Sequence, residues 1–257
     1  MHPYATYATY PSLVDRTVLV TGGATGIGES LVEHFAAQGS RVGFIDIDEA
    51  AGRALVARLG QSRTVPLFLH ADLTDLKAMQ AAIESLRARF GPVTALVNNA
   101  ANDVRHTVEE TTPESWDAGM AVNLKHQFFA AKAVLPDMRA AGGGSIVNLG
   151  SVSWMLKIRN LTVYQTAKAA VKGLTRSLAR ELGTMNIRVN SIVPGWVMTE
   201  KQVRLWLDDA GRAELERGQC IHRPLLPEHI ARMALFLAAD DSDMCTAQDF
   251  VVDGGWT

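Results

Sequence analysis

Cysteine is nearly absent from this chain, which has only Cys220 and Cys245 among its 257 residues. The two do not form a Cys-x-x-Cys pair, so the sequence indicates neither a cysteine-ligated metal cluster nor a disulfide framework. We therefore expect no metal centre. A reducing cytoplasm is the expected location, because so few cysteines suit a compartment in which disulfides do not persist.

An excess of charge of either sign is also lacking. The chain has 25 lysine and arginine residues against 27 aspartate and glutamate residues, and its formal net charge is −2. This balance offers no basic surface to nucleic acid or to an anionic membrane. No apolar run reaches the roughly 18 residues of a membrane span, and the first residues lack the cationic-then-apolar order of a secretory signal. The expected partner is a small molecule.

What the chain does contain is a regular alternation of short apolar, β-branched runs with helical patterns. The alternation predicts an α/β fold in which a parallel sheet carries helices on both faces. We expect one doubly wound domain over residues 13–257 and a flexible arm over residues 1–12. The alternative for the arm is packing on another subunit through Tyr4, Tyr7 and Tyr10. The predicted strands lie at 17–21, 41–46, 65–71, 94–97, 145–149, 187–193 and 248–253.

A glycine-rich turn, GGATGIG at 22–28, follows the first predicted strand and precedes a helical pattern. Its glycines would let the backbone approach a pyrophosphate, which the helix N-terminus would face. Asp46 ends the second strand, where an acid can accept hydrogen bonds from an adenosine ribose. It could instead cap the next helix, but Asp48 is better placed for that. Because a 2′-phosphate would meet like charge at Asp46, NAD is favoured, and Arg41 and Arg53 leave some NADP tolerance open.

A second pattern carries chemistry. Tyr164 and Lys168 are one helical turn apart and share a helix face, and Ser151 follows the strand at 145–149. Tyrosine has a reference pKa of about 10, and a cation beside it favours the phenolate and lowers that pKa. Ser151 could then hydrogen-bond the oxygen that gains or loses the proton. In isolation, such a pair more often belongs to an ordinary amphipathic helix, so its meaning depends on the other motifs.

Together these motifs resemble the short-chain dehydrogenase/reductase family. The resemblance covers residues 15–255 and rests on TGGATGIG at 21–28, NNAA at 98–101, Asn123, Ser151, YQTAK at 164–168 and PG at 194–195. It implies a single Rossmann-type domain with seven parallel strands, a nicotinamide cofactor and a homotetramer. The catalytic residues that it implies are Asn123, Ser151, Tyr164 and Lys168.

The resemblance also implies roles for these residues. Tyr164 takes the substrate proton as phenolate, Lys168 lowers its pKa and binds the nicotinamide ribose, and Asn123 holds a water that relays protons. Since the tyrosine and lysine supply the base, His106 and His126 are interpreted as polar lining or surface groups, and His222 as structural. Residues expected to bind NAD lie in the glycine turn, at or after strand ends, or on the Tyr/Lys helix: Gly22, Thr25, Gly26, Ile27, Gly28, Asp46, Ile47, Asp72, Leu73, Asn98, Ala100, Tyr164, Lys168, Pro194, Val197 and Thr199.

Motifs outside this common core are similar to those of bacterial sugar 1-dehydrogenases of the D-xylose dehydrogenase type: YPSL at 10–13, NDVRH at 102–106, GSVSW at 150–154 and DGGW at 253–256. This implies oxidation of the anomeric hydroxyl of an aldose, such as L-arabinose, D-xylose or a 6-deoxy sugar, to the aldonolactone. The expected substrate pocket consists of Asn102, Ser151, Ser153, Trp154, Tyr164 and Trp196.

Two alternatives stay open from the sequence. The chain could be another secondary-alcohol dehydrogenase or a 3-oxoacyl-thioester reductase of the same family, although Asp46 weighs against an NADP-dependent reductase. It could also be an NAD-sensing regulator without turnover, which would have no use for a complete catalytic set.

Overall fold

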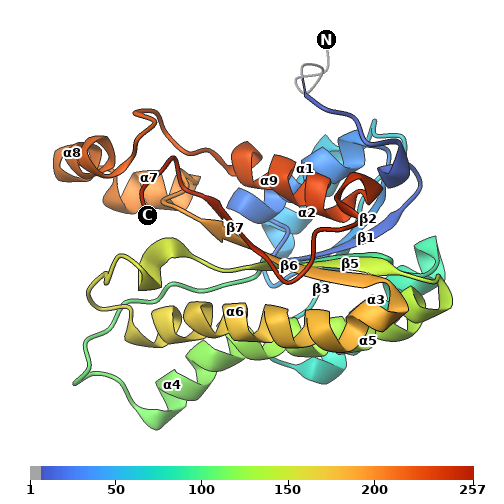
Figure 1. Ribbon diagram of the computed structural model, residues 1–257, viewed down its shortest axis with the longest axis horizontal. Coiled ribbons are helices and arrows are strands. Elements are labelled where there is room, and N and C mark those ends of the chain that lie inside the picture. Colours follow the sequence, from blue (N-terminus) through green and yellow to red (C-terminus); the bar gives the residue numbers. More distant parts are fainter. Residues whose placement is uncertain (1–6) are drawn as a thin grey trace.

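Parallel strands form the centre of the molecule (Figure 1). The computed structural model describes residues 7–257, and within them seven strands make one sheet in the order β3-β2-β1-β4-β5-β6-β7. The predicted doubly wound fold is confirmed. Strand order reverses between β1 and β4, and ligands of open α/β sheets bind at such a switch point. The strands are β1 (Thr17–Thr21), β2 (Arg41–Asp46), β3 (Leu67–His70), β4 (Ala95–Asn98), β5 (Gly144–Leu149), β6 (Ile187–Pro194) and β7 (Asp249–Val252).

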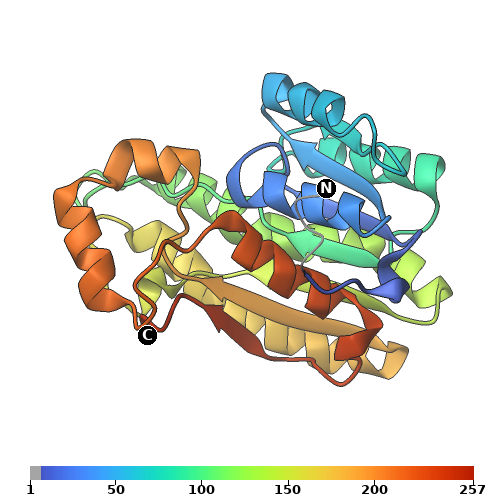
Figure 2. The same ribbon diagram turned by 90° about the horizontal axis from the view of Figure 1, so that it is seen from above.

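Helices cover both faces of the sheet, as Figure 1 and Figure 2 show. One face carries α1 (Gly26–Ala37), α2 (Glu49–Arg58) and α9 (Pro227–Ala238). The other carries α3 (Leu76–Phe90), α4 (Pro113–Met120), α5 (His126–Ala140) and α6 (Thr162–Leu182), with a π-helical turn, Ala121–Lys125, between α4 and α5. Short 3-10 turns lie at Pro11–Leu13, Val152–Trp154, Gly183–Met185 and Asp240–Ser242. No helix within the described residues is long and apolar enough to span a membrane.

The first strand shows why its sequence is apolar throughout. Successive side chains of a strand point to opposite faces of the sheet. Val18 and Val20 pack in the core under α1 and α9, whereas Leu19 packs in the core under α3 and α5, and all three are fully buried. A strand with helices over both faces therefore needs an apolar side chain at every position.

Two helices stand outside these layers. α7 (Glu200–Trp206) and α8 (Asp209–Gly218) follow β6 and lie beyond the carboxyl edge of the sheet, at the left of Figure 2. The segment that contains them leaves and rejoins the domain at one place. There Val197 forms a parallel bridge with Leu225, and the Met198 N–H donates to the Leu225 carbonyl at 2.7 Å.

The described part of the N-terminal arm lies on the domain. The Tyr10 N–H donates to Gln38 Oε1 at 2.8 Å, after the end of α1. The Arg232 guanidinium, from α9, lies 3.6 Å from the ring centroid of Tyr7. This part of the arm therefore has contacts with both helices, and the flexibility expected from its sequence stays a prediction. The first six residues, Tyr4 among them, lie outside the described residues.

Candidate active site

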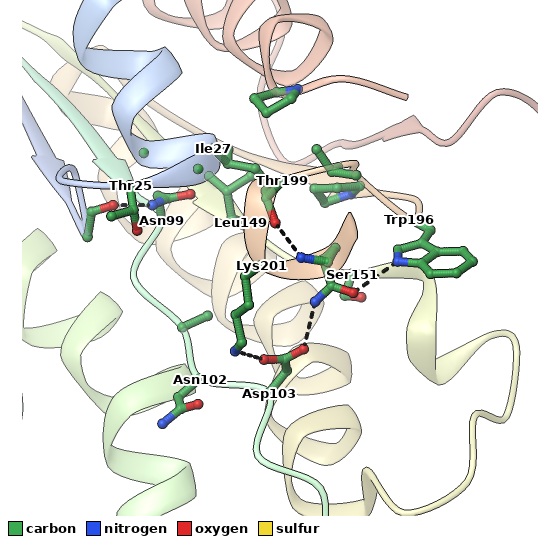
Figure 3. Close-up of a pocket in the computed structure, with 18 of the residues that line it drawn as sticks. Thr25, Ile27, Asn99, Asn102, Asp103, Leu149, Ser151, Trp196, Thr199 and Lys201 are labelled. Atoms are coloured by element: carbon green, nitrogen blue, oxygen red, sulfur yellow. Dashed lines mark hydrogen bonds and ion pairs between the residues drawn. The ribbon is translucent and has the colours of Figure 1, made fainter. Parts of the chain in front are cut away.

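A cleft of about 1360 Å³ runs along the carboxyl edge of the sheet, where the strands end. Figure 3 shows part of its wall. Of the predicted site residues, Asn98, Asn123 and Trp154 do not line it. Those that do are Gly22, Thr25, Gly26, Ile27, Gly28, Asp46, Ile47, Asp72, Leu73, Ala100, Asn102, Ser151, Ser153, Tyr164, Lys168, Pro194, Trp196, Val197 and Thr199.

The glycine turn brings backbone so close to backbone that no side chain fits. A Cβ on Gly28 would lie 1.7 Å from the carbonyl oxygen of Gly22. A Cβ on Gly22, whose φ is +64°, would lie 2.7 Å from the Cα of Ala100. The turn leads into the N-terminus of α1, whose first N–H groups have no partner within the helix and carry the positive end of its dipole. This bare backbone therefore fits the pyrophosphate of a dinucleotide cofactor.

Asp46 lies at the end of β2 and holds the glycine turn. Its Oδ2 accepts a hydrogen bond from the Ala24 N–H at 2.9 Å, and its Oδ1 accepts one from the Asp48 N–H at 3.1 Å. Asp48 caps α2, as predicted, by accepting from the Ala51 N–H at 2.9 Å. Each Asp46 oxygen keeps a further lone pair, so the carboxylate can also accept hydrogen bonds from a ribose in the cleft.

The two arginines considered for a 2′-phosphate lie elsewhere. Arg41 begins β2, at the amino edge of the sheet, and its guanidinium is 3.7 Å from the Asp15 carboxylate. Arg53 pairs with Glu49, one turn away on α2, at 2.6 Å. Neither arginine lines the cleft, so the NADP tolerance expected from them has no support in the structure.

The reactive side chains come from the end of β5 and from α6. Ser151 caps the 3-10 turn after β5, accepting from the Ser153 N–H at 3.1 Å. Tyr164 and Lys168 lie one turn apart, and Lys168 Nζ is 5.7 Å from the centroid of the Tyr164 ring. The buried Lys168 ammonium donates to the Leu149 carbonyl, at the end of β5, at 2.8 Å. The fold thus brings the predicted serine, tyrosine and lysine to one wall of the cleft.

Burial governs the charge of both groups on α6. It raises the pKa of Tyr164 to about 12; a hydrogen bond with Ser151 opposes this shift, and the negative charge of Asp103 adds to it. Burial also lowers the pKa of Lys168 to about 7. In this structure the Lys168 ammonium donates to the Leu149 carbonyl, and its expected effect on the tyrosine pKa stays a prediction.

Asn123, the predicted fourth catalytic residue, is buried in the π-helical turn. Its Oδ1 accepts from the Asn102 N–H at 2.9 Å, and its Nδ2 donates to the Asn102 carbonyl at 3.0 Å. Nδ2 also donates to the Gly119 carbonyl at 2.9 Å. The side chain of Asn123 therefore fixes the loop that carries Asn102, rather than lining the cleft itself.

A buried histidine lies at the start of α5, near the reactive pair. Burial, together with the charge of Lys168, lowers the pKa of His126 to about 3, so its ring is neutral. Its Nε2 is 3.5 Å from the Thr21 hydroxyl. None of the three histidines considered, His106, His126 and His222, lines the cleft, and His126 is fully buried rather than a lining or surface group.

Of two adjacent asparagines, the structure places Asn99 on the cleft and not Asn98, for which a cofactor contact is predicted. Asn98, the last residue of β4, is fully buried, and its Nδ2 donates to Asn148 Oδ1 on β5 at 2.9 Å. Asn99 lines the cleft, and its Nδ2 donates to the Gly22 carbonyl at 2.8 Å. Because successive side chains of a strand point to opposite sides, two adjacent residues at a strand end can face the cleft and the core, respectively.

The tryptophans of the cleft also differ from the expectation. Trp154 ends the 3-10 turn after β5 and does not line the cleft. Trp196 lines it as predicted, and so do Trp206 and Trp256. The ring centroids of Trp196 and Trp256 are 6.4 Å apart. The DGGW motif was the only sequence signal that included Trp256.

Three polar residues at the mouth of the cleft are joined by no sequence pattern, although Asp103 lies within the NDVRH motif. Asp103, Lys201 and Gln202 line the cleft, and the Asp103 carboxylate accepts hydrogen bonds from the other two. The first is separated from the other two by 98 and 99 positions along the chain. No local spacing pattern could have joined them.

Known proteins match almost the whole chain. A family model described as enoyl-(acyl carrier protein) reductase matches residues 22–257. A probable galactose dehydrogenase of Rhizobium meliloti strain 1021 is 47% identical, over 96% of this chain and 96% of its own. A D-xylose 1-dehydrogenase of Caulobacter vibrioides is 44% identical, over 97% of this chain and 98% of its own. The crystal structure of a proposed short-chain alcohol dehydrogenase from Sinorhizobium meliloti 1021 has a TM-score of 0.90 at 29% identity, covering 96% of this chain and 98% of that one.

Proposed function

The chain belongs to the short-chain dehydrogenase/reductase family, and on this premise we propose that it oxidises the anomeric hydroxyl of an aldose to the aldonolactone with NAD. Its relatives make it an oxidoreductase that acts on CH–OH donors. The observation that carries the proposal is the meeting of Ser151, Tyr164 and Lys168 with the glycine turn and Asp46 in one cleft. Because two relatives are a probable galactose dehydrogenase and a D-xylose 1-dehydrogenase, the candidates are D-xylose, L-arabinose, D-galactose and a 6-deoxy sugar.

NAD would supply the hydride acceptor. The bare backbone between Gly22 and Gly28 would hold its pyrophosphate, and Asp46 would accept hydrogen bonds from its adenosine ribose. The Asp46 carboxylate suits two ribose hydroxyls and repels a 2′-phosphate, which favours NAD over NADP. Asp72 and Leu73, after β3, would flank the adenine end of the groove.

Proton transfer falls to Tyr164. As phenolate, its oxygen takes the proton of the sugar hydroxyl, while Ser151 donates a hydrogen bond to the sugar oxygen and stabilises the developing carbonyl. When the Lys168 amine is protonated, its positive charge favours the phenolate form of Tyr164. A water on Asn123 would carry protons from Lys168 to solvent. Because the Asn123 side chain is engaged with Asn102, its main-chain carbonyl is the acceptor that this water would use.

The substrate half of the cleft offers polar groups beside flat apolar walls, a combination that suits a sugar ring. The Ser153 hydroxyl is buried and has no hydrogen-bond partner among the described residues, so a sugar hydroxyl would satisfy it. Asn102 lines the same cleft with an amide that can donate and accept. Trp196 and Trp256 would cover the apolar face of the ring.

A panel of aldoses, run with NAD and separately with NADP, tests the proposal. We expect at least one of the four named sugars to give NADH, with a kcat/KM at least about tenfold above that measured with NADP. A 3-oxoacyl thioester and secondary alcohols are the comparison substrates. Activity on these and on no aldose would overturn the sugar assignment. Cofactor binding without any turnover would favour an NAD-sensing regulator.

We further propose a homotetramer, on the family resemblance. Trp116 on α4 and Phe128 on α5 are exposed apolar side chains, and a subunit contact would remove such surface from water. Light scattering should then give four times the chain mass of 27.8 kDa. A monomer mass would contradict this assembly.

A further inference from the structure

Two segments form the mouth of the substrate half of the cleft. One is the loop after β4, residues 99–112, and the other is the segment with α7, residues 195–207. Asp103 of the first binds the second with both carboxylate oxygens. Lys201 Nζ donates to its Oδ1 at 2.6 Å, and Gln202 Nε2 donates to its Oδ2 at 3.0 Å (Figure 3). One carboxylate thus joins the two sides of the mouth.

The hydrogen bonds continue to the wall of the pocket. Gln202 Oε1 accepts from the indole N–H of Trp196 at 2.9 Å (Figure 3). Gln202 therefore uses the donor end of its amide on Asp103 and the acceptor end on Trp196, so that the three side chains form a relay. A glutamate at this position would also accept from the indole, but it would face Asp103 with like charge.

We propose that Asp103 is a positioning residue for the substrate. Through Gln202 it fixes the indole of Trp196 in the orientation that forms the flat wall of the pocket, and it holds α7 beside the mouth of the cleft. The inference rests on the proposed function where it takes a sugar as the ligand of that wall. The restraint on α7 does not depend on which ligand binds.

The hydrogen bonds through Gln202 should position the Trp196 indole more strongly than the Lys201–Asp103 ion pair does. The Lys201 side chain is 53% exposed and that of Asp103 is 25% exposed, and water screens an ion pair at such a surface so that it contributes little. Gln202 and Trp196 are half-buried, and a donor sheltered from water is costly to leave without its acceptor. Loss of the relay should therefore disturb the wall more than loss of the lysine.

A second contact joins the same two segments. The Arg105 guanidinium lies 3.9 Å from the ring centroid of Trp206, within cation–π distance. Removal of the relay should therefore loosen residues 195–207 without detaching them from the domain. Kinetic effects of the variants then stay measurable.

Four variants distinguish the effect of the Gln202 hydrogen bonds from the effect of the Lys201–Asp103 ion pair. Asp103→Ala and Gln202→Leu break the relay. Asp103→Asn keeps an acceptor for Gln202, and Lys201→Met removes only the ion pair. Asp249→Asn is the matched control, since it removes a comparable partly exposed pair, Lys172–Asp249 at 3.3 Å, between residues that do not line the cleft.

The kinetic readout is the KM for the sugar against the KM for NAD. We expect Asp103→Ala and Gln202→Leu to raise KM for the sugar by about three- to tenfold, the range set by one net hydrogen bond. In both variants KM for NAD should change by less than about twofold. Asp103→Asn, Lys201→Met and the control should stay within about twofold of the wild-type KM for the sugar.

Hydrogen exchange gives a readout that needs no turnover. Peptides covering residues 195–207 should exchange faster in Asp103→Ala and Gln202→Leu, with unchanged exchange in the strands of the sheet. Unchanged KM and unchanged exchange in Gln202→Leu would overturn the proposal. So would an Asp103→Asn variant as impaired as Asp103→Ala, because Asp103 would then bind the sugar through its own charge.

The same data separate failure of the relay from failure of the sugar assignment. If the wild-type chain oxidises no aldose, faster exchange over residues 195–207 in the two relay variants upholds the relay although the substrate is different. Unchanged exchange rejects the relay whatever the substrate.

Discussion

The cofactor half and the substrate half of the cleft are held by different kinds of bonds. In the cofactor half, the side chains of Asp46 and Asn99 hold the glycine turn, but backbone also meets backbone. The Gly22 N–H donates to the Ile45 carbonyl at 2.8 Å, and no Cβ fits on Gly28. In the substrate half, the two segments at the mouth meet through side chains such as Asp103 and Gln202. The close backbone approach of the first arrangement leaves little room for substitution, whereas the side chains of the second can be exchanged without moving the backbone. Substrate choice can therefore change while the fold and the cofactor site stay the same.

The largest effect is expected where the two halves meet. Tyr164→Phe removes the proton acceptor but keeps the ring, so kcat should fall by at least about 10³-fold. NADH should still bind, because the glycine turn and Asp46 are untouched. Steady-state kinetics and a fluorescence titration with NADH measure the two properties. Turnover within about tenfold of wild type would remove Tyr164 from the role of base.

Gly28→Ala should damage the cofactor half alone. The new Cβ would lie 1.7 Å from the Gly22 carbonyl oxygen, and overpacking of this kind costs about 1–3 kcal/mol. We expect KM for NAD to rise by about tenfold or more, with KM for the sugar little changed. Gly173→Ala on α6 is the control, since nothing lies within 4 Å of a Cβ there. Thermal unfolding and kinetics of both variants give the comparison, and an equal rise in KM for NAD would contradict it.

Trp256→Ala should damage the substrate half alone. Trp256 lines the cleft beside Trp196, whereas Trp154 does not line it. We expect KM for the sugar to rise by about three- to tenfold in Trp256→Ala, the loss typical of one aromatic contact. Trp154→Ala is the matched variant and should leave KM within about twofold of wild type. A larger rise in KM in Trp154→Ala would mean that Trp154 contacts the sugar, as the sequence predicts.

The smallest effect is electrostatic. Burial raises the pKa of Tyr164 most, and the negative charge of Asp103 adds to the rise. Asp103→Asn removes that charge and lowers the pKa. In the proposed mechanism the phenolate is the active form, so the acidic limb of the kcat/KM profile should move to lower pH. Lys201→Met leaves the Asp103 charge without its partner and should move the limb to higher pH. Shifts of the same sign in both variants would contradict this coupling.

The cofactor half could be predicted from the sequence because its parts are local. The strand, the turn and the helix follow one another within residues 17–37, and each has its own pattern. The error at Asn98 shows the limit of such patterns. The strand end was predicted one residue early, at 97 rather than at Asn98. Which of two adjacent asparagines faces the cleft depends on the register of β4 with β5, where Asn98 pairs with Asn148.

The substrate half could not be predicted to the same depth, because its contacts join distant parts of the chain. Asp103 and Lys201 are 98 positions apart, and neither stretch shows a periodicity that points to the other. The pKa of Tyr164 could not be predicted from the sequence for the same reason, because it depends on how distant parts of the chain pack. The sequence places Lys168 one turn away, but only the packed structure shows that burial raises the pKa of the phenol.

The stretch between Val197 and Leu225 begins and ends at neighbouring positions, and it also bonds to the C-terminal turn, where the Ile221 N–H donates to the Gly254 carbonyl at 2.9 Å. Residues 198–224 enter and leave the domain side by side, so a transplant from a relative would need two cuts at neighbouring positions and would leave the sheet and most of both cores intact. Directed evolution of a new sugar preference can therefore randomise or exchange this stretch as a unit. The loop that contains Asp103 should be varied together with this stretch. A stretch taken from a relative would lack Lys201 and Gln202, which bind the Asp103 carboxylate.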